Sequence, residues 1–165
     1  TGSLFSCPYS SQKMIIKEIR EFNQKLTQKG IRIIPVRISD KRMLVYVYRP
    51  EKLKEDFSDE KTQIILKCKG YDCTNLSQCI CRLIQKLQSD PDFPHEIGLF
   101  LGYPAEDVKG FIENKAACSK CSGCWKVYGD EQAARILFKK YKKCTEIYCR
   151  RWKSGVAVEQ LTITI

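Results

Sequence analysis

The chain has 165 residues, of which 43% are hydrophobic and 29% are charged, and its net charge is +10. This length and composition are typical of one globular domain, residues 1–165, and they exclude a largely disordered chain. No apolar run approaches the roughly 20 residues that span a bilayer, so the sequence also excludes a membrane-spanning helix. A basic surface attracts phosphates, nucleic acids and acidic proteins, although net charge governs solubility more than it identifies a function.

The first half of the chain predicts a helix, two strands and three further helices. Apolar residues recur at spacings of three and four from Gln12 to Lys29, which is typical of a helix with one buried face, and Gly30 ends it. The β-branched segment 31–38 and the apolar segment 43–48 predict the two strands of a hairpin. Helices are then expected from Pro50 to Phe57, from the N-cap Asp59 to Lys69, and from the N-cap Asn75 through Leu87.

The second half predicts strands and helices in alternation. The apolar run Ile97–Leu101 predicts a short strand, which turns into a helix over 105–114. Two more strands, at Trp125–Tyr128 and Val156–Ile165, are expected on either side of a long helix over 129–152. Together these elements predict an α/β fold of mixed (α+β) type, with a single mixed β-sheet of about five strands and helices packed on it.

Cysteine is unusually frequent, and its context predicts the compartment. The segment from Thr1 to Ser11 lacks the basic start and the long apolar centre of a signal peptide, so we expect a cytoplasmic protein. In a reducing cytosol the cysteines should remain free thiols, and such a load suits an organism with little exposure to oxygen. The ten cysteines are Cys7, Cys68, Cys73, Cys79, Cys81, Cys118, Cys121, Cys124, Cys144 and Cys149.

The segment Phe93–Pro104, followed by Glu106–Phe111, resembles the signature of an uncharacterised bacterial family, the domain of unknown function numbered 3793. The segments Thr1–Phe5, Val45–Arg49 and Trp125–Tyr128 also resemble it, so the similarity covers essentially the whole chain. The family is found mainly in anaerobic Firmicutes, and the resemblance implies a bacterial, cytoplasmic, single-domain protein without an established activity, cofactor or catalytic residue. Members usually carry a further segment ahead of the Thr1 match, which implies that this chain lacks a short N-terminal family segment.

A first candidate site surrounds the predicted strand 97–101. His95, the only histidine, can act as an acid, a base or a metal ligand, while Glu96 would point to the opposite face of an extended segment. The following turn leads into a helix N-terminus, a place where ligands of α/β proteins gather. A packed histidine followed by a tight turn is the alternative interpretation. The ligand-binding candidates are His95, Glu96, Gly102, Tyr103, Asp107, Lys126 and Tyr128.

A second candidate site is the loop that carries Cys118, Cys121 and Cys124. Two-residue spacing allows thiolates to converge on zinc or an iron–sulfur cluster. A fourth ligand would come from elsewhere, because Tyr128 occupies the position of the next ferredoxin cysteine. Lys120 favours thiolates, so thiol redox chemistry and incidental reduced cysteines are further interpretations. Candidates for the fourth ligand are Cys73, Cys79, Cys81, Cys144, Cys149 and His95.

The last long helix carries a third pattern. Aromatic residues Tyr141, Tyr148 and Trp152 are interleaved with cations, and such residues stack on unpaired bases and meet phosphates. The alternative is an amphipathic helix with a solvated basic face and an aromatic core stripe, which the lack of a recognisable nucleic-acid module favours. The cations are Lys139, Lys140, Lys142, Lys143, Arg150, Arg151 and Lys153.

These patterns favour a metal- or thiol-redox-linked accessory protein of anaerobic bacteria. The alternative is a module without catalysis that binds a small ligand or a protein partner at the turn after Leu101, and nucleic-acid binding is the third hypothesis. An acidic protein partner would also fit the net charge. The sequence contains no P-loop, dinucleotide fingerprint or nucleophile elbow, so it predicts no enzyme class.

Overall fold

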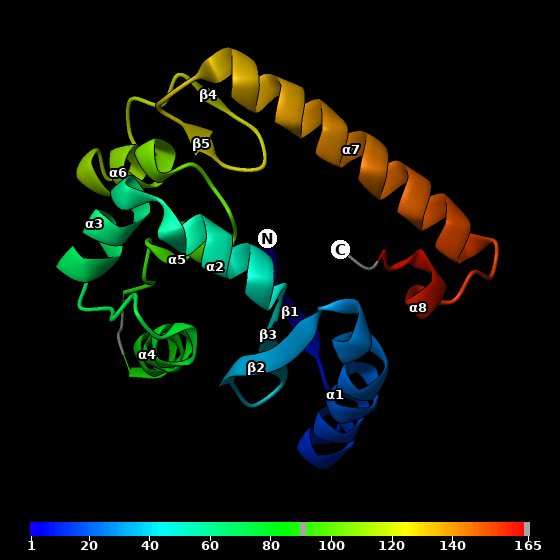
Figure 1. Cartoon of the computed structure of the whole chain (residues 1–165). Coiled ribbons are helices and arrows are strands. Elements are labelled where there is room, and N and C mark those ends of the chain that lie inside the picture. Colours follow the sequence, from blue (N-terminus) through cyan, green and yellow to red (C-terminus); the bar gives the residue numbers. More distant parts are fainter. Residues whose placement is uncertain (90–91, 164–165) are drawn as a thin grey trace.

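The structure, a computed structural model, describes residues 1–89 and 92–163 and contains two small sheets and several helices (Figure 1). The strands are β1 (Gly2–Pro8), β2 (Arg32–Ile38), β3 (Arg42–Tyr48), β4 (Cys121–Ser122) and β5 (Lys126–Val127). The helices are α1 (Gln12–Leu26), η1 (Thr27–Lys29), α2 (Pro50–Ser58), α3 (Glu60–Cys68), α4 (Leu76–Ser89), α5 (Ile97–Phe100), α6 (Ala105–Glu113), α7 (Glu131–Lys153) and α8 (Val158–Leu161). The mixed helix-and-strand class is confirmed.

Sheet A consists of three antiparallel strands in the order β1-β3-β2. β2 and β3 form the predicted hairpin, with Ile34 opposite Tyr46. β1, which the sequence patterns did not predict, pairs with the other side of β3 and places Leu4 opposite Tyr46. The central strand is therefore β3, whose nearly continuous apolar sequence is typical of a strand covered on both faces.

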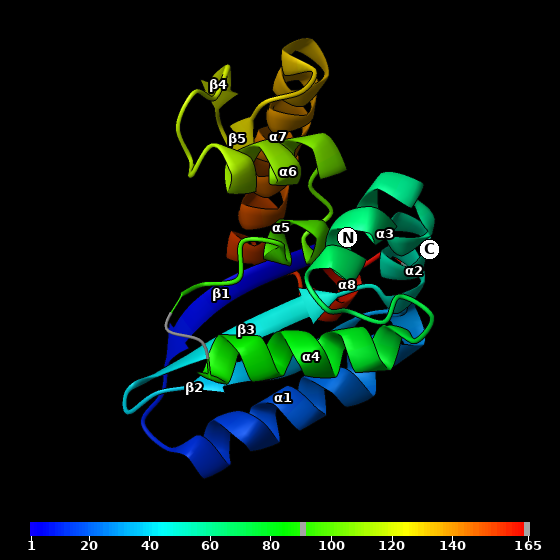
Figure 2. The same ribbon diagram turned by 90° about the vertical axis from the view of Figure 1, so that its left-hand side faces the viewer.

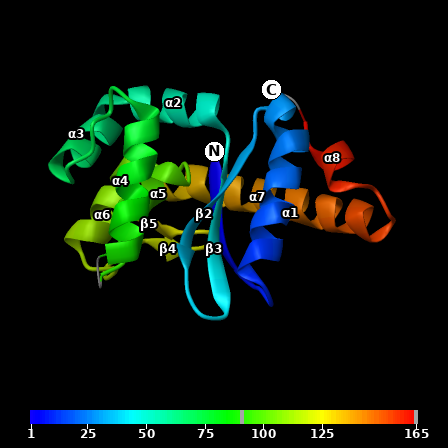
Figure 3. The ribbon, with the colours of Figure 1, turned by 90° about the horizontal axis from the view of Figure 1, so that it is seen from below.

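Helices cover both faces of β3 (Figure 3). Met43 and Val45 pack with Ile19 of α1, whereas Tyr46 belongs to the larger core that contains Leu83 of α4. Successive side chains of a strand point to opposite faces, so one apolar strand contributes to both cores. The larger core extends from α4 across α2 and α3 to α5. Val108 of α6 also belongs to it, so this core connects α6 to the rest of the molecule.

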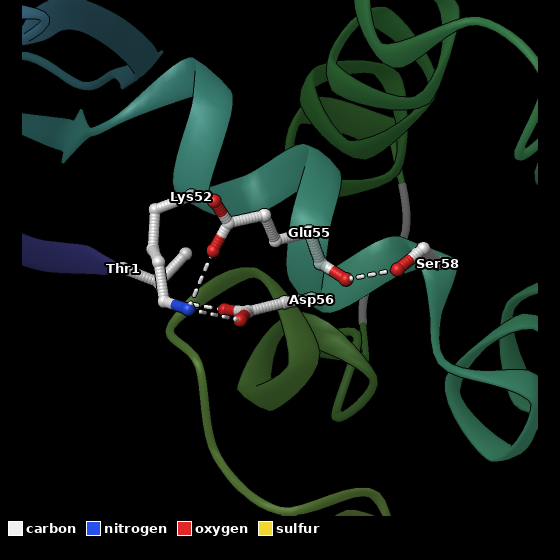
Figure 4. Close-up of polar contacts among 5 residues, drawn as sticks. All are labelled: Thr1, Lys52, Glu55, Asp56 and Ser58. Atoms are coloured by element: carbon white, nitrogen blue, oxygen red, sulfur yellow. Dashed lines mark hydrogen bonds and ion pairs between the residues drawn. The ribbon is translucent and has the colours of Figure 1, made fainter.

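α2 closes over the start of β1 (Figure 4). The Thr1 hydroxyl donates a hydrogen bond to the Asp56 carboxylate, and Lys52 pairs with Glu55 at 2.8 Å and with Asp56 at 3.7 Å. Asp59 then caps α3 as predicted, because its carboxylate accepts a hydrogen bond of 2.9 Å from the backbone of the first turn. Beyond these contacts, α2 packs against α5 and α3 packs against α6.

The predicted strand Ile97–Leu101 is wrong, since Ile97–Phe100 forms the short helix α5 and all four of its residues are buried. The Ile97 amide donates to the Pro94 carbonyl at 3.0 Å, so the helical turn begins at the end of the proline-containing segment. An apolar run of this length fits either a buried strand or a buried helical turn, and periodicity does not distinguish them. The turn after Leu101 therefore joins two helices.

The prediction of a single five-stranded sheet is also wrong. β5 forms within the predicted strand Trp125–Tyr128, but it pairs with β4 in the neighbouring cysteine loop and makes a separate two-stranded sheet. The predicted closing strand is wrong where it is described, because Val158–Leu161 forms α8, and residues 164–165 lie outside the described residues. This segment is held by side chains: those of Lys29 and Arg49 donate hydrogen bonds to its backbone carbonyls.

α7 spans the molecule from the β4–β5 hairpin to α8 (Figures 1 and 2). Asp130 caps it, because its carboxylate accepts a hydrogen bond of 3.0 Å from the Ala133 amide. The first turns pack on the hairpin, whereas every residue from Tyr141 to Lys153 is exposed. Within the ranges 1–89 and 92–163, no helix has the length and apolar character needed to cross a membrane.

Candidate functional site

A cavity of about 450 Å³ lies between α5, α6 and the β4–β5 hairpin, elements that Figure 2 shows next to one another. Four of the seven ligand-binding candidates line this cavity: His95, Tyr103, Asp107 and Lys126. They come from three segments of the chain, and the change of α5 from strand to helix did not separate them. Further lining residues include Phe93, Leu101, Val108, Phe111, Cys124 and Trp125.

Aromatic rings form much of the cavity wall. Tyr103 and Trp125 stack with ring centroids 4.8 Å apart and an interplanar angle of 26°. Trp125 also meets the ring of Phe138 on α7 edge-on at 4.6 Å, and His95 contacts Phe111 of α6 with ring centroids 5.0 Å apart. Each aromatic side chain has few rotamers and a large contact area, so these pairs make the wall rigid.

Asp107 connects α6 to the β4–β5 hairpin. One carboxylate oxygen accepts a hydrogen bond of 2.7 Å from the indole nitrogen of Trp125, and the other accepts bonds of 2.7 Å and 2.8 Å from the amides of Tyr128 and Gly129. Asp107 is only 3% exposed. Buried polar groups are stable when they are fully hydrogen-bonded, so this side chain positions the wall of the cavity.

Lys126 lies beside a loop with unusual backbone conformations. Its ammonium donates a hydrogen bond of 2.5 Å to the Ala116 carbonyl. Lys115, Ala116 and Cys118 have φ values of +47°, +66° and +58°, which are uncommon for residues other than glycine. An ammonium has three donors, and in the described part of the chain Lys126 forms no ion pair, so it retains hydrogen-bonding capacity toward a ligand.

Glu96 has surroundings different from those of His95. Its carboxylate is buried and accepts hydrogen bonds from Lys86 at 2.7 Å and from the Tyr71 hydroxyl at 3.1 Å. Burial alone would raise the pKa of Glu96, but the hydrogen bonds that its carboxylate accepts, first among them the one from Lys86, together with the positive charge of Lys86 hold this pKa below its ordinary value. Glu96 thus joins α5 to α4 and does not line the cavity, whereas the exposed His95 does.

Gly102 and Tyr128 have positions that explain their residue types. Gly102 has a φ of +80°, and a Cβ atom there would come within 2.8 Å of the Thr1 side chain, so the turn needs glycine. Tyr128 packs against Gly110 of α6, and its hydroxyl is buried without a hydrogen-bond partner among the described residues. Neither residue lines the cavity of His95 and Lys126.

The three cysteines of the loop have different surroundings. Cys121 packs with the Trp125 cluster, Cys124 lines the cavity, and Cys118 is exposed. In residues 1–89 and 92–163, no three His, Cys, Asp or Glu side chains form a group that could hold a metal ion. The prediction of zinc or an iron–sulfur cluster thus has no ligand set there. Among the proposed fourth ligands, Cys79 is buried in the larger core, where burial raises the pKa of its thiol to about 11.

Sequence reasoning identified Tyr103 but missed the other aromatic residues of the site. Phe111 follows Asp107 by four residues on α6, and this spacing places both on one face of the helix, so a signal was present. Trp125 was predicted only as a strand residue, since nothing local indicates that its indole bonds to a carboxylate 18 residues earlier. Cys124 was predicted as a metal or redox residue, and its place in the cavity depends on the β4–β5 turn.

Comparisons with known proteins concern the family alone. A search of curated proteins found no match, and a search of solved structures found none either. Residues 1–162 match the family described as "Protein of unknown function (DUF3793)". The segments that resembled this family, Phe93–Pro104, Glu106–Phe111 and Trp125–Tyr128, also supply much of the cavity lining. Because the match extends over almost all of the sequence, the chain belongs to the DUF3793 family of proteins of unknown function.

Proposed function

We propose that the protein binds a small molecule with an apolar or aromatic body and one anionic group in the cavity between α5, α6 and the β4–β5 hairpin. The observation that carries the proposal is the convergence of His95, Tyr103, Trp125 and Lys126 around a volume of 450 Å³. Pockets for small ligands have volumes of about 300–1,000 Å³, mostly apolar walls and a few polar groups that orient the ligand. This cavity has that composition.

The apolar body would lie against the aromatic wall. The stacked rings of Tyr103 and Trp125 present flat surfaces, and Phe111 with Val108 adds apolar area from α6. Rings favour offset stacking or edge contacts with other rings, so a planar ligand gains more here than an equally apolar flexible one. The wall is also preformed, which reduces the entropy lost on binding.

The charges around the cavity favour an anionic group. Lys126 supplies an ammonium, and the imidazole of His95 supplies a further nitrogen at the exposed side. Among the described residues, Asp107 is the one carboxylate in the lining, and three hydrogen bonds from Trp125, Tyr128 and Gly129 already compensate its charge. A ligand carboxylate or sulfonate would therefore meet donors at the cavity, with its charge assisting the hydrogen bonds.

The test uses 8-anilinonaphthalene-1-sulfonate, an aromatic dye with one negative charge. In a Trp152→Phe background Trp125 is the only tryptophan, so quenching of its fluorescence by energy transfer to the dye reports binding, and the cysteine protection below places the dye. We expect Lys126→Met and His95→Ala each to weaken binding about 5- to 10-fold, because each removes a polar partner of the sulfonate. Lys109→Ala is the matched control, since Lys109 is exposed on α6 and pairs only with Glu113 in the described structure.

A second measurement places the ligand by cysteine protection. Cys124 lines the cavity, while Cys118 is exposed on the same loop outside it. We expect the bound dye to slow alkylation of Cys124 by iodoacetamide and to leave the rate at Cys118 unchanged, as measured by peptide mass spectrometry. Equal rates at Cys124 with and without dye, or binding that Lys126→Met and Lys109→Ala weaken equally, would contradict the proposal.

A further inference from the structure

The second half of α7 is exposed to solvent, and its aromatic side chains continue the face that packs against Trp125 in the first half. Ala134 and Phe138 pack with Trp125, and alternating steps of three and four residues from Phe138 lead along the same face to Tyr141, Tyr148 and Trp152. These three residues, called the aromatic stripe below, are 45%, 39% and 62% exposed. The aromatic core stripe expected in the simpler interpretation of this helix is therefore wrong, because the core ends before the helix does.

Cations dominate the rest of this helix. α7 contains eight Lys and Arg residues against two Glu residues, so it holds +6 of the net charge of +10. Arg135 pairs with Glu131 in the first turns, but no cation after it forms an ion pair among the described residues. These unpaired cations are Lys139, Lys140, Lys142, Lys143, Arg150, Arg151 and Lys153.

Helix geometry places cations on both sides of the aromatic stripe. At about 100° per residue, Lys140 and Arg151 lie about 80–100° to one side of its centre, and Lys142 and Lys153 lie about 100–120° to the other. The remaining cations cover the outer face. Positive charge thus borders the stripe on both sides near each of its ends, and the one carboxylate of this half, Glu146, lies on the outer side of the helix.

We propose that this face of α7 binds single-stranded nucleic acid without sequence specificity, with bases stacked on Tyr148 and Trp152 and phosphates on the flanking cations. Exposed rings next to basic side chains are the combination that binds unpaired bases and their backbone. A duplex keeps its bases stacked on one another, so it would use the cations and leave the rings unused. Two copies of α7 would repel each other, because each carries the same excess of positive charge.

An acidic amphipathic helix is the competing occupant, and the distribution of charge decides against it. Such a partner would meet the aromatic stripe and its immediate borders, but the cations of the outer face, such as Lys139, Lys143 and Arg150, would remain unused. A flexible polyanion can contact both the borders and the outer face. The nucleic acid therefore accounts for more of the charge on α7.

The experiment measures anisotropy of fluorescein-labelled 20-nucleotide dT with the full chain. If four cations meet phosphates, log Kd should change with log salt with a slope of about 2.8, and binding should weaken about 50-fold between 50 and 200 mM NaCl. Lys142→Gln with Lys153→Gln should reduce this slope by about 1.4. Trp152→Ala, and Tyr148→Ala with Trp152→Ala, should weaken binding at least 10-fold with the slope unchanged, because they remove stacking and keep the charges.

Ile136→Ala is the matched control, since Ile136 is 56% exposed on α7 but lies outside the aromatic stripe. Circular dichroism verifies that each variant folds, and Trp152→Ala alone changes the most exposed side chain of the stripe. Absence of binding at 50 mM NaCl, equal affinity for a 20-base-pair duplex, or unchanged affinity of folded Trp152→Ala would each overturn the proposal. Competition by a 20-residue polyglutamate equal to that by unlabelled dT would overturn it in favour of an acidic protein partner.

Discussion

The part of the molecule around sheet A and the part formed by the β4–β5 hairpin with α7 are held together in different ways. In the first, side chains such as Tyr46 and Leu83 are completely buried in a core shared by several helices. In the second, a small cluster around Trp125 is supplemented by the hydrogen bonds that Asp107 accepts. The difference shows how a small protein can combine a well-packed core around sheet A with an open cavity and an exposed helix face in its second part.

The largest effect on stability is expected in the part of the molecule around sheet A. Leu83→Ala removes a side chain with no exposed surface from α4, and the cavity left in the core should lower the free energy of unfolding by about 2–5 kcal/mol. Urea denaturation followed by circular dichroism measures this change. Ile64→Ala on α3 is the control, because Ile64 is 56% exposed and its truncation should change stability by less than about 0.5 kcal/mol. If both variants lost similar amounts of unfolding free energy, stability would not be concentrated in the core.

Asp107→Ala tests the second part of the molecule. The change leaves the indole nitrogen of Trp125 and the amides of Tyr128 and Gly129 without an acceptor. We therefore expect the free energy of local opening of this part to fall by about 2–4 kcal/mol. Hydrogen exchange should then accelerate in β5 and the first turns of α7, while amides of β3 remain protected. Equal acceleration in β3 and β5 would mean that the two parts unfold as one unit.

The Glu96 carboxylate stabilises the part of the molecule around sheet A through its hydrogen bonds from Lys86 and Tyr71. Glu96→Gln leaves the ammonium of Lys86 without its negative partner, and the side chain of Lys86 is only 14% exposed, so we expect a loss of about 1–3 kcal/mol at pH 7. The folded state lowers the pKa of Glu96. Its contribution is therefore complete above the ordinary carboxyl pKa of about 4.3 and disappears as the pH falls through the lower folded value.

Urea unfolding of both proteins between pH 3 and 7 measures this linkage. The stability difference between the native chain and Glu96→Gln should be largest at neutral pH and should shrink at the acidic end of the range. Asp40→Asn is a control, because Asp40 lies exposed in the turn between β2 and β3 and its side chain forms no ion pair among the described residues. A difference for Glu96→Gln that stays constant down to pH 3 would contradict the assigned pairing with Lys86.

Local sequence patterns predicted the secondary structure around sheet A better than that of the second part. The apolar run of β3, the proline at the start of α2 and the caps Asp59 and Asn75 are signals that lie within a few residues of what they determine, and the structure confirms them. β1 was missed because its short, partly polar sequence acquires strand structure only by pairing with β3, about 40 residues later. α5 was misread because burial favours apolar residues in a strand and in a helical turn alike.

The same distinction applies to the candidate site. His95, Tyr103, Asp107 and Lys126 were chosen for their chemistry, and the structure brings them to one cavity. The role of Asp107 could not be derived from the sequence, because its donors follow it by 18 to 22 residues across a loop. The two-residue spacing of the cysteines predicted a metal or redox site, and the structure places Cys124 in the lining of the cavity and Cys121 against the Trp125 cluster, with no group of three metal-ligating side chains among the described residues.

The smallest expected effect separates two neighbouring residues of α7. Leu137 is half-buried against the Trp125 cluster, whereas Ile136 is 56% exposed. We expect Leu137→Ala to destabilise the second part by about 1–2 kcal/mol and Ile136→Ala to change it by less than about 0.5 kcal/mol, with hydrogen exchange of β5 as the readout. Both substitutions leave alanine in a helix, so differences in helix propensity are small and the contrast reports packing. Equal effects would mean that α7 is held by its ends, at Asp130 and α8, and that the uncovered face begins before Tyr141.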